Sequence, residues 1–99
     1  MNKTAILLLI LLSWGSSVWA IDTNYVGITE IKVWTAYIDI YTEAEHECMD
    51  QQKHRYNLRK EEKEMFSILL TAMTAKNKVS LNYVCSNNKP QINGVRVKP

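Results

Sequence analysis

Three side chains alternate along one predicted strand in a pattern that suits carbohydrate binding. Tyr37, Asp39 and Tyr41 fall at every second position and so share the outward face of the strand, and Trp34 stands just before it. Aromatic rings stack on the C–H faces of sugars, and carboxylates accept hydrogen bonds from sugar hydroxyls; the same rings could stack on bases. We predict a ligand site at these four residues. The alternative is that the rings only pack against the helix, a loop or a neighbouring subunit.

A second set of reactive side chains is His46, Lys53, His54 and Arg55. Two histidines could act as acid and base on a phosphodiester while the cations stabilise the developing charge, so a small secreted hydrolase or nuclease is one interpretation. His46 also begins an HExxH zinc-protease pattern. Asp50 occupies the position of the second histidine, so this motif fails.

Acidic residues and the two histidines crowd the segment 43–54, where they could bind a divalent ion. In a polar loop such a run is more typical of a solvated charged surface, so no metal is predicted. The chain has no GxSxG elbow, phosphate-binding loop or dinucleotide fingerprint. We therefore expect no catalysis and no cofactor.

The two cysteines, Cys48 and Cys85, favour a single disulfide. In an oxidising compartment an even pair in a small exported domain most often forms a bond, and two cysteines allow one intramolecular connectivity. Two buried thiols or an intermolecular bond are the alternatives. A bonded Cys48 could not supply the thiolate that zinc requires.

Residues 1–20 have the three parts of a signal peptide. These are Lys3, an apolar run from Ala5 to Leu12, and small residues before a cleavage site after Ala20. The run is too short to cross a bilayer, although an uncleaved membrane anchor is the alternative. We predict a signal peptide at 1–20, a single domain at 21–99, and a secreted or periplasmic product without a membrane anchor.

The charge balance of the exported domain argues against nucleic acid as a partner. Loss of Lys3 with the signal leaves 11 of the 12 basic residues against 10 acidic residues, a net charge of +1. Nucleic acid or anionic lipid would require clustered, uncompensated Lys and Arg. The balance therefore favours sugars as ligands of the aromatic site.

Two-residue periodicity predicts strands on both sides of one helical segment. The predicted strands are 25–34, 36–43, 55–58, 79–85 and 91–99. The first two form a hairpin around Thr35. The last has Val95 and Val97 pointing inward, with a bulge or bend at Asn93-Gly94.

Residues 60–78 are predicted to form the helix, with acidic residues in its first turn, lysines in its last, and Asn57 as the N-cap. The apolar side chains cover an arc of about 200°, wider than the arc of about 100° that one packing partner needs. Five of them form a candidate oligomer interface: Met65, Phe66, Leu69, Leu70 and Met73. Either the helix is covered by its own sheet and a neighbouring subunit, or it is sunk deeply in its own domain.

The order strand, strand, strand, helix, strand, strand predicts a mainly β fold with one helix, and it is the plan of a five-stranded OB-fold barrel. The segment EKEMFSILLTAMTAKNKVSLNYVC and the terminal INGVRV strand resemble small secreted bacterial OB-fold proteins similar to the B subunits of subtilase-cytotoxin and pertussis-like toxins. This likeness covers most of residues 26–98. It implies a ring-forming, non-catalytic, glycan-binding subunit whose helix lines the centre of the ring.

The toxin B subunits are longer, and their serine-centred sialic-acid pocket has no aligned counterpart here, so no residue is carried over as a sugar contact. We expect a non-catalytic binding module for glycan or another cell-surface target. Two assemblies stay open. One is a homopentamer, with or without an enzymatic A subunit, and the other is a monomeric periplasmic interaction or inhibitor protein.

Overall fold

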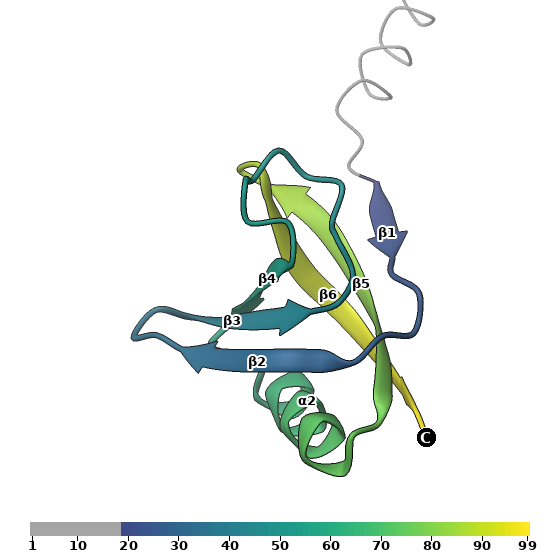
Figure 1. Cartoon of the computed structure of the whole chain (residues 1–99). Coiled ribbons are helices and arrows are strands. Elements are labelled where there is room, and N and C mark those ends of the chain that lie inside the picture. Colours follow the sequence, from purple (N-terminus) through teal and green to yellow (C-terminus); the bar gives the residue numbers. More distant parts are fainter. Residues whose placement is uncertain (1–18) are drawn as a thin grey trace, which may run out of the picture.

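One helix packs against one strongly bent sheet in the computed structural model, which describes residues 19–99 (Figure 1). The predicted signal peptide therefore lies outside the described residues, except for Trp19 and Ala20. The elements in chain order are β1 (Ala20–Asp22), β2 (Ile28–Val33), β3 (Tyr37–Thr42), β4 (Arg55–Arg59), α2 (Lys63–Ala75), β5 (Lys78–Ser86) and β6 (Lys89–Lys98). β5 and β6 form a long ribbon that crosses β2 and β3 at a steep angle, with α2 beneath them (Figure 1).

The sheet has six strands in the order β1-β5-β6-β4-β3-β2. Neighbouring strands are antiparallel except β4 and β6, which run parallel with Asn57 opposite Gln91. The mainly β fold with one helix is confirmed, but the five-stranded closed barrel is wrong. Val26 and Val79 form an isolated bridge rather than a ladder, and β1 takes the adjoining edge of β5, so the sheet stays open.

Strand β1 was not predicted, because a strand of three residues is too short to show a two-residue period. The predicted β2–β3 hairpin is confirmed, and so is the irregularity at Asn93. Asn82 lies opposite Gly94 while Tyr83 lies opposite Ile92, so Asn93 is an extra residue in β6. Such a residue makes a β-bulge and increases the local bend.

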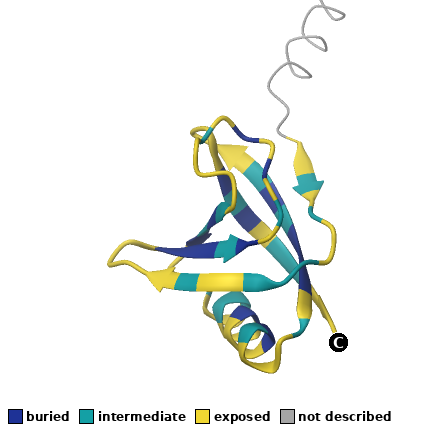
Figure 2. Cartoon of the chain, in the orientation of Figure 1, coloured by how far each residue is buried: buried dark blue, intermediate teal, exposed yellow. Residues whose placement is uncertain are grey.

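The core lies between the inner face of the sheet and α2 (Figure 2). The alternation of Ile38 and Ile40 in β3 turns both side chains inward, as the sequence period predicts. The other buried apolar residues of the core are Cys48, Tyr56, Leu58, Leu69, Ala72, Val79, Leu81, Tyr83 and Ile92. The rings of Tyr56 and Tyr83 meet edge to face with their centroids 5.3 Å apart.

Helix α2 is shorter at both ends than the predicted segment 60–78. Its N-cap is Glu62 instead of Asn57, because Asn57 is held inside β4 by strand pairing. It ends where Lys76 adopts a left-handed conformation with φ of 59°, and Asn77 N–H closes the last turn on the Ala72 carbonyl. No helix in the described part of the chain has the length and apolar character needed to cross a bilayer.

The candidate interface residues of α2 divide between the core and the surface. Leu69 is fully buried in its own domain, while Met65, Phe66 and Met73 are half-buried and Leu70 is exposed. The alternative of a helix sunk deeply in its own domain is therefore wrong, because the sheet covers only one side of α2. Coverage of the other side by a neighbouring subunit stays a prediction.

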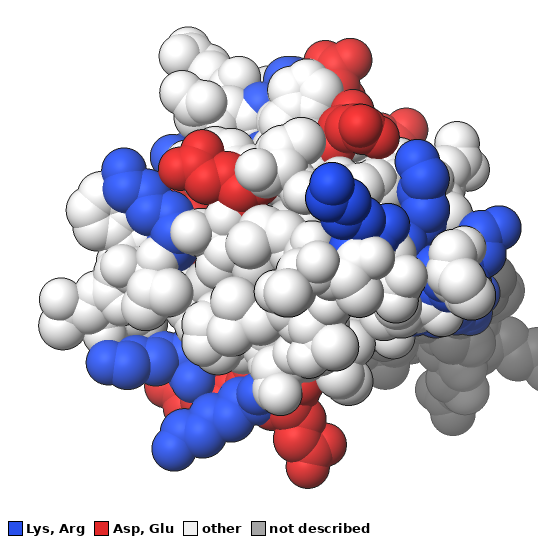
Figure 3. Space-filling model, turned by 60° about the horizontal axis from the view of Figure 1, so that its bottom comes forward, with Lys and Arg blue, Asp and Glu red and all other residues white. Residues whose placement is uncertain are grey.

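An uncharged area lies on the side of the molecule where α2 is found (Figure 3). Ile68 and Leu70 of the helix are exposed, and so is Val97 of β6. Val97 lies opposite the buried Val79 and so on the inner face, as predicted, but it is 39% exposed because β6 extends past the core toward its end at Lys98. This helix face is thus a surface on which apolar and small polar side chains meet solvent.

Candidate ligand-binding site

Trp34 and Tyr37 flank the turn of the β2–β3 hairpin and form one aromatic patch. Their ring centroids lie 6.3 Å apart with the planes inclined by 33°, and Trp34 N–H donates to the Tyr37 carbonyl at 2.9 Å. Lys60 Nζ donates to the Thr35 carbonyl at 2.9 Å, which fastens the turn to the segment before α2. The two side chains are 42% and 40% exposed, so both are open to contact from solution.

Asp39 holds this patch in place from below the surface. Its side chain is only 2% exposed. Trp34 Nε1–H donates to Oδ2 at 2.8 Å and Asn57 Nδ2 donates to Oδ1 at 2.9 Å. The predicted carboxylate thus lies beside the aromatic residues, but its oxygens are bonded inside the protein and orient Trp34.

A groove of about 380 Å³ opens beside Tyr37, across the outer face of β3, β4 and β6. We call it the aromatic groove. Its lining residues are Ala36, Tyr37, Asn57, Leu58, Arg59, Glu61, Ser86, Asn87, Lys89 and Gln91. An aromatic wall faced by amides, hydroxyls and charged groups is the composition that sugar-sized polar ligands require.

The charges of the aromatic groove are mixed. Arg59 and Lys89 bring positive charge and Glu61 brings negative charge, while Arg59 Nη2 also pairs with Glu62 Oε1 at 2.9 Å. Among the described residues, the buried Asn57 Oδ1 has no hydrogen-bond partner. A buried acceptor is normally hydrogen-bonded, and a water or a ligand hydroxyl could donate to Asn57 Oδ1.

Tyr41, the fourth predicted residue, lies apart from the aromatic groove. It is paired across the strands with Arg55, whose guanidinium lies 3.2 Å from Asp50 Oδ2. Burial acts to raise the pKa of Asp50, but the hydrogen bond and charge of Arg55 outweigh it, so the pKa is lowered. The structure therefore brings Trp34, Tyr37 and Asp39 together and leaves Tyr41 beside an internal ion pair.

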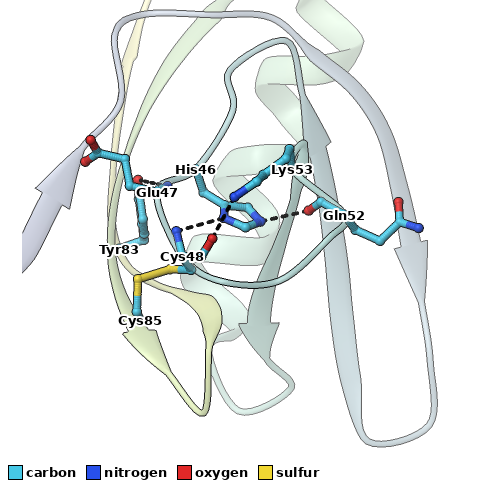
Figure 4. The surroundings of a disulfide bond; sticks show 7 residues. All are labelled: His46, Glu47, Cys48, Gln52, Lys53, Tyr83 and Cys85. Atoms are coloured by element: carbon cyan, nitrogen blue, oxygen red, sulfur yellow. Dashed lines mark hydrogen bonds between the residues drawn. A yellow bond between two sulfur atoms is a disulfide. The ribbon is translucent and has the colours of Figure 1, made fainter.

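His46 is enclosed in the loop 43–54 and is 3% exposed (Figure 4). Cys48 N–H donates to Nδ1 at 3.1 Å, and Nε2 lies 2.7 Å from the Gln52 carbonyl. Desolvation by burial is the main cause that lowers the pKa of His46. Both ring nitrogens are thus engaged by the main chain, so this histidine is not free to exchange a proton with a substrate, as the hydrolase interpretation requires.

His54, the other histidine, is exposed, with Nδ1 at 3.0 Å from the Thr42 carbonyl. Within residues 19–99 no three His, Cys, Asp or Glu side chains are grouped so as to hold a metal ion. The acidic run of the loop is partly used internally, because Asp50 pairs with Arg55.

The predicted disulfide between Cys48 and Cys85 is confirmed, with the two Cα atoms 5.5 Å apart (Figure 4). Asp50 N–H also donates to the Asn88 carbonyl at 3.0 Å. Asn88 belongs to the β5–β6 turn, where it adopts a left-handed φ of 67°. The loop 43–54 is therefore joined to the hairpin that forms one wall of the aromatic groove.

Several groove residues were missed from the sequence. Asn57 and Arg59 alternate with the buried Tyr56 and Leu58 in β4, and this period would have placed them on the outer face with Tyr37. Lys89 and Gln91 had no such local signal. They reach the aromatic groove because β6 runs parallel to β4, a pairing between distant segments.

Replacing Asp39 by Asn should lower the free energy of unfolding by about 1 to 3 kcal/mol, because an amide group would turn a donor toward Trp34 Nε1 or Asn57 Nδ2. Trp34 is the sole tryptophan once residues 1–20 are removed, so its fluorescence reports the change during urea unfolding. The control is Asp22→Asn, an exposed carboxylate bonded to Asn82 Nδ2, which should cost about 0.5 kcal/mol or less. Equal effects of the two variants would contradict the role of Asp39.

Comparison with protein-family models, curated proteins and solved structures finds no match for this chain. The aromatic groove is the feature in which a predicted ligand residue, Tyr37, lines an open cavity.

Proposed function

We propose that the chain is a secreted, non-catalytic binding module that recognises glycans through the aromatic groove. The observation that carries the proposal is the exposed Tyr37 ring standing as one wall of a groove whose other walls present amides, hydroxyls and charges. A ring of this kind stacks on a sugar face while neighbouring polar groups bond its hydroxyls. Trp34 extends the platform, and Asp39 keeps Trp34 in one orientation.

The charges of the aromatic groove support a sugar over a nucleic acid. Glu61 lies in the same lining as Arg59 and Lys89, and Arg59 is partly neutralised by Glu62. Nucleic-acid binding depends on uncompensated cations along a backbone track. A glycan, by contrast, is bound by the mixed donors and acceptors found here.

Export is part of the proposal. A disulfide between Cys48 and Cys85 is typical of proteins that fold in an oxidising compartment outside the cytoplasm. The sequence pattern of residues 1–20 is that of a signal peptide. Both features support a secreted or periplasmic protein.

A glycan array tests the proposal with protein purified after export of the full-length chain. At least one glycan should bind, and Tyr37→Ala should weaken its binding about tenfold or more, because the stacking surface is lost. The matched control is Tyr25→Ala, since Tyr25 is exposed to a similar extent and lies outside the aromatic groove, with Lys98 Nζ 4.4 Å from the centroid of its ring.

Tyr25→Ala should bind as the unchanged protein does. Two results would contradict the proposal. One is an array without a bound glycan, and the other is an equal loss of binding in the Tyr37 and Tyr25 variants.

A second candidate function is contact with another protein through the exposed helix face. Ile68, Leu70 and Val97 favour it, because apolar side chains on an uncharged surface are a common feature of protein interfaces. The partner is either further copies of the chain, as in a toxin B-subunit-like homopentamer with or without an A subunit, or another extracytoplasmic protein. Light scattering distinguishes these two kinds of partner, since a strictly monomeric protein would exclude the homopentamer.

A further inference from the structure

His46 is held in one protonation state by its neighbours. A backbone N–H can only donate, so the bond from Cys48 N–H requires a lone pair on Nδ1. The single proton of the neutral ring must then reside on Nε2, from which it is donated to the Gln52 carbonyl at 2.7 Å. The folded loop 43–54 thus requires the neutral ring and one of its two tautomers.

Desolvation by burial is the largest cause that opposes protonation of the ring, and the Gln52 carbonyl, the next in size, favours it. Lys53, whose Nζ donates to the Cys48 carbonyl at 2.8 Å, and Arg55 of β4 place positive charge near the imidazole. Asp50 is the carboxylate that favours protonation, and its charge is shared with Arg55.

Two buried tyrosines also pack near the ring. The centroids of the Tyr56 and His46 rings lie 5.6 Å apart in an edge-to-face arrangement. Tyr83 of β5 packs edge to face against Tyr56. Burial raises the pKa of both tyrosines, so neither carries charge at neutral pH. Desolvation by burial, with the charges of Lys53 and Arg55, holds the pKa of His46 below its ordinary value of 6.5.

Two links carry the position of this loop to the aromatic groove. Cys48, whose N–H bonds the ring, is joined covalently to Cys85, and the next residue, Ser86, lines the groove. The second link is the bond from Asp50 N–H to the Asn88 carbonyl, next to the lining residue Lys89. We therefore expect a displacement of Cys48 or Asp50 to be transmitted to the β5–β6 turn.

We propose that His46 is a pH switch for the aromatic groove: its protonation loosens the loop 43–54, shifts the β5–β6 turn and weakens ligand binding. Protonation turns Nδ1 from an acceptor into a donor that opposes Cys48 N–H, so this bond must break. The ligand part of the inference rests on the proposed function. The loop and turn part stands without it.

The direction of the pH effect follows from linkage. The pKa of His46 is lower in the folded than in the unfolded chain, so above about 6.5 the folded state is not penalised. As the pH falls below 6.5 the unfolded chain takes up the proton first, and stability declines toward the folded pKa. The lowered pKa of Asp50 acts below its ordinary 3.8, so its contribution falls outside this window.

Nuclear magnetic resonance tests the switch without a ligand. As the pH is lowered from 7.5, the imidazole signal of His46 should titrate with a midpoint below 6.5, and the amide signals of Ser86, Asn87 and Lys89 should shift with the same midpoint. His46→Asn is the non-titrating variant, because Asn Oδ1 can still accept from Cys48 N–H, and its turn signals should stay constant. His54→Asn is the control and should behave as the unchanged protein does.

Binding is then measured at pH 7.5 and at a pH below the His46 midpoint found by resonance, with the array glycan that gives the strongest signal. The dissociation constant should rise about fivefold or more on acidification in the unchanged protein and in His54→Asn, and should stay constant in His46→Asn. By reciprocity, saturation with the glycan should move the His46 titration to lower pH.

The two proposals fail in different ways. Turn signals that do not follow His46 in the unchanged protein overturn the switch, and this measurement does not depend on whether His46→Asn folds. A switch seen by resonance without any bound glycan overturns the proposed function alone. Glycan binding that is independent of pH overturns the switch and leaves the proposed function intact.

Discussion

Changing Cys48 and Cys85 together to alanine is expected to lower the free energy of unfolding by about 3 to 4 kcal/mol. The disulfide joins residues 37 positions apart, and closing a loop of that length removes much of the entropy of the unfolded chain. A domain of this size has a total stability of about 5 to 10 kcal/mol, so the bond accounts for a large share of it. Cys48 is also buried in the core, and its loss leaves a small cavity.

Urea unfolding followed by Trp34 fluorescence measures the effect. A thiol reductant should lower the unfolding midpoint of the unchanged protein and leave that of the double alanine variant constant. If the variant is not recovered after export, the reduced unchanged protein supplies the same comparison. A loss below about 1 kcal/mol would contradict the prediction.

Leu69→Ala should cost about 3 kcal/mol, whereas Leu70→Ala should cost less than about 1 kcal/mol in a monomer. Leu69 is fully buried between α2 and the sheet, while its neighbour Leu70 is 38% exposed. Truncating a buried leucine removes apolar contacts and leaves a cavity. Truncating an exposed leucine removes fewer contacts and leaves no enclosed cavity. The two changes are chemically identical, so their difference isolates burial.

Unfolding at two protein concentrations extends this comparison to the helix face. If the exposed face of α2 is covered by another copy, the cost of Leu70→Ala should rise with protein concentration and the mass in solution should fall. If the protein is monomeric, the cost should be small at every concentration. A large, concentration-independent cost for Leu70→Ala would show that the side chain is buried in the monomer, contrary to the structure.

The disulfide and helix α2 lie in different parts of the molecule. The disulfide joins the loop 43–54 to the β5–β6 hairpin, and both flank the aromatic groove. Helix α2 supports the opposite, inner face of the sheet. Loss of the disulfide should therefore weaken glycan binding as well as stability, while Leu70→Ala should leave the groove unchanged.

Local sequence patterns predicted most of the elements because they depend on backbone geometry within a few residues. The two-residue period of β3, the bulge at Asn93 and the helical spacing of α2 are visible without knowledge of any partner. The extent of α2 was predicted less well. A wide apolar arc does not tell how much of the helix the sheet will cover, and here Leu70 stays exposed.

The sequence alone determined the order of strands β2 to β6 around one helix, the single possible intramolecular disulfide, and the aromatic residues that face outward. Tertiary structure decided the rest: β1 on the edge of β5, the parallel pairing of β4 and β6, the burial of Asp39, and the neutral state of His46. The first three depend on contacts between segments distant in the chain, and the state of His46 depends on how the irregular loop 43–54 folds around the ring. Such contacts leave no period or motif in the sequence, because they form only when the whole chain packs.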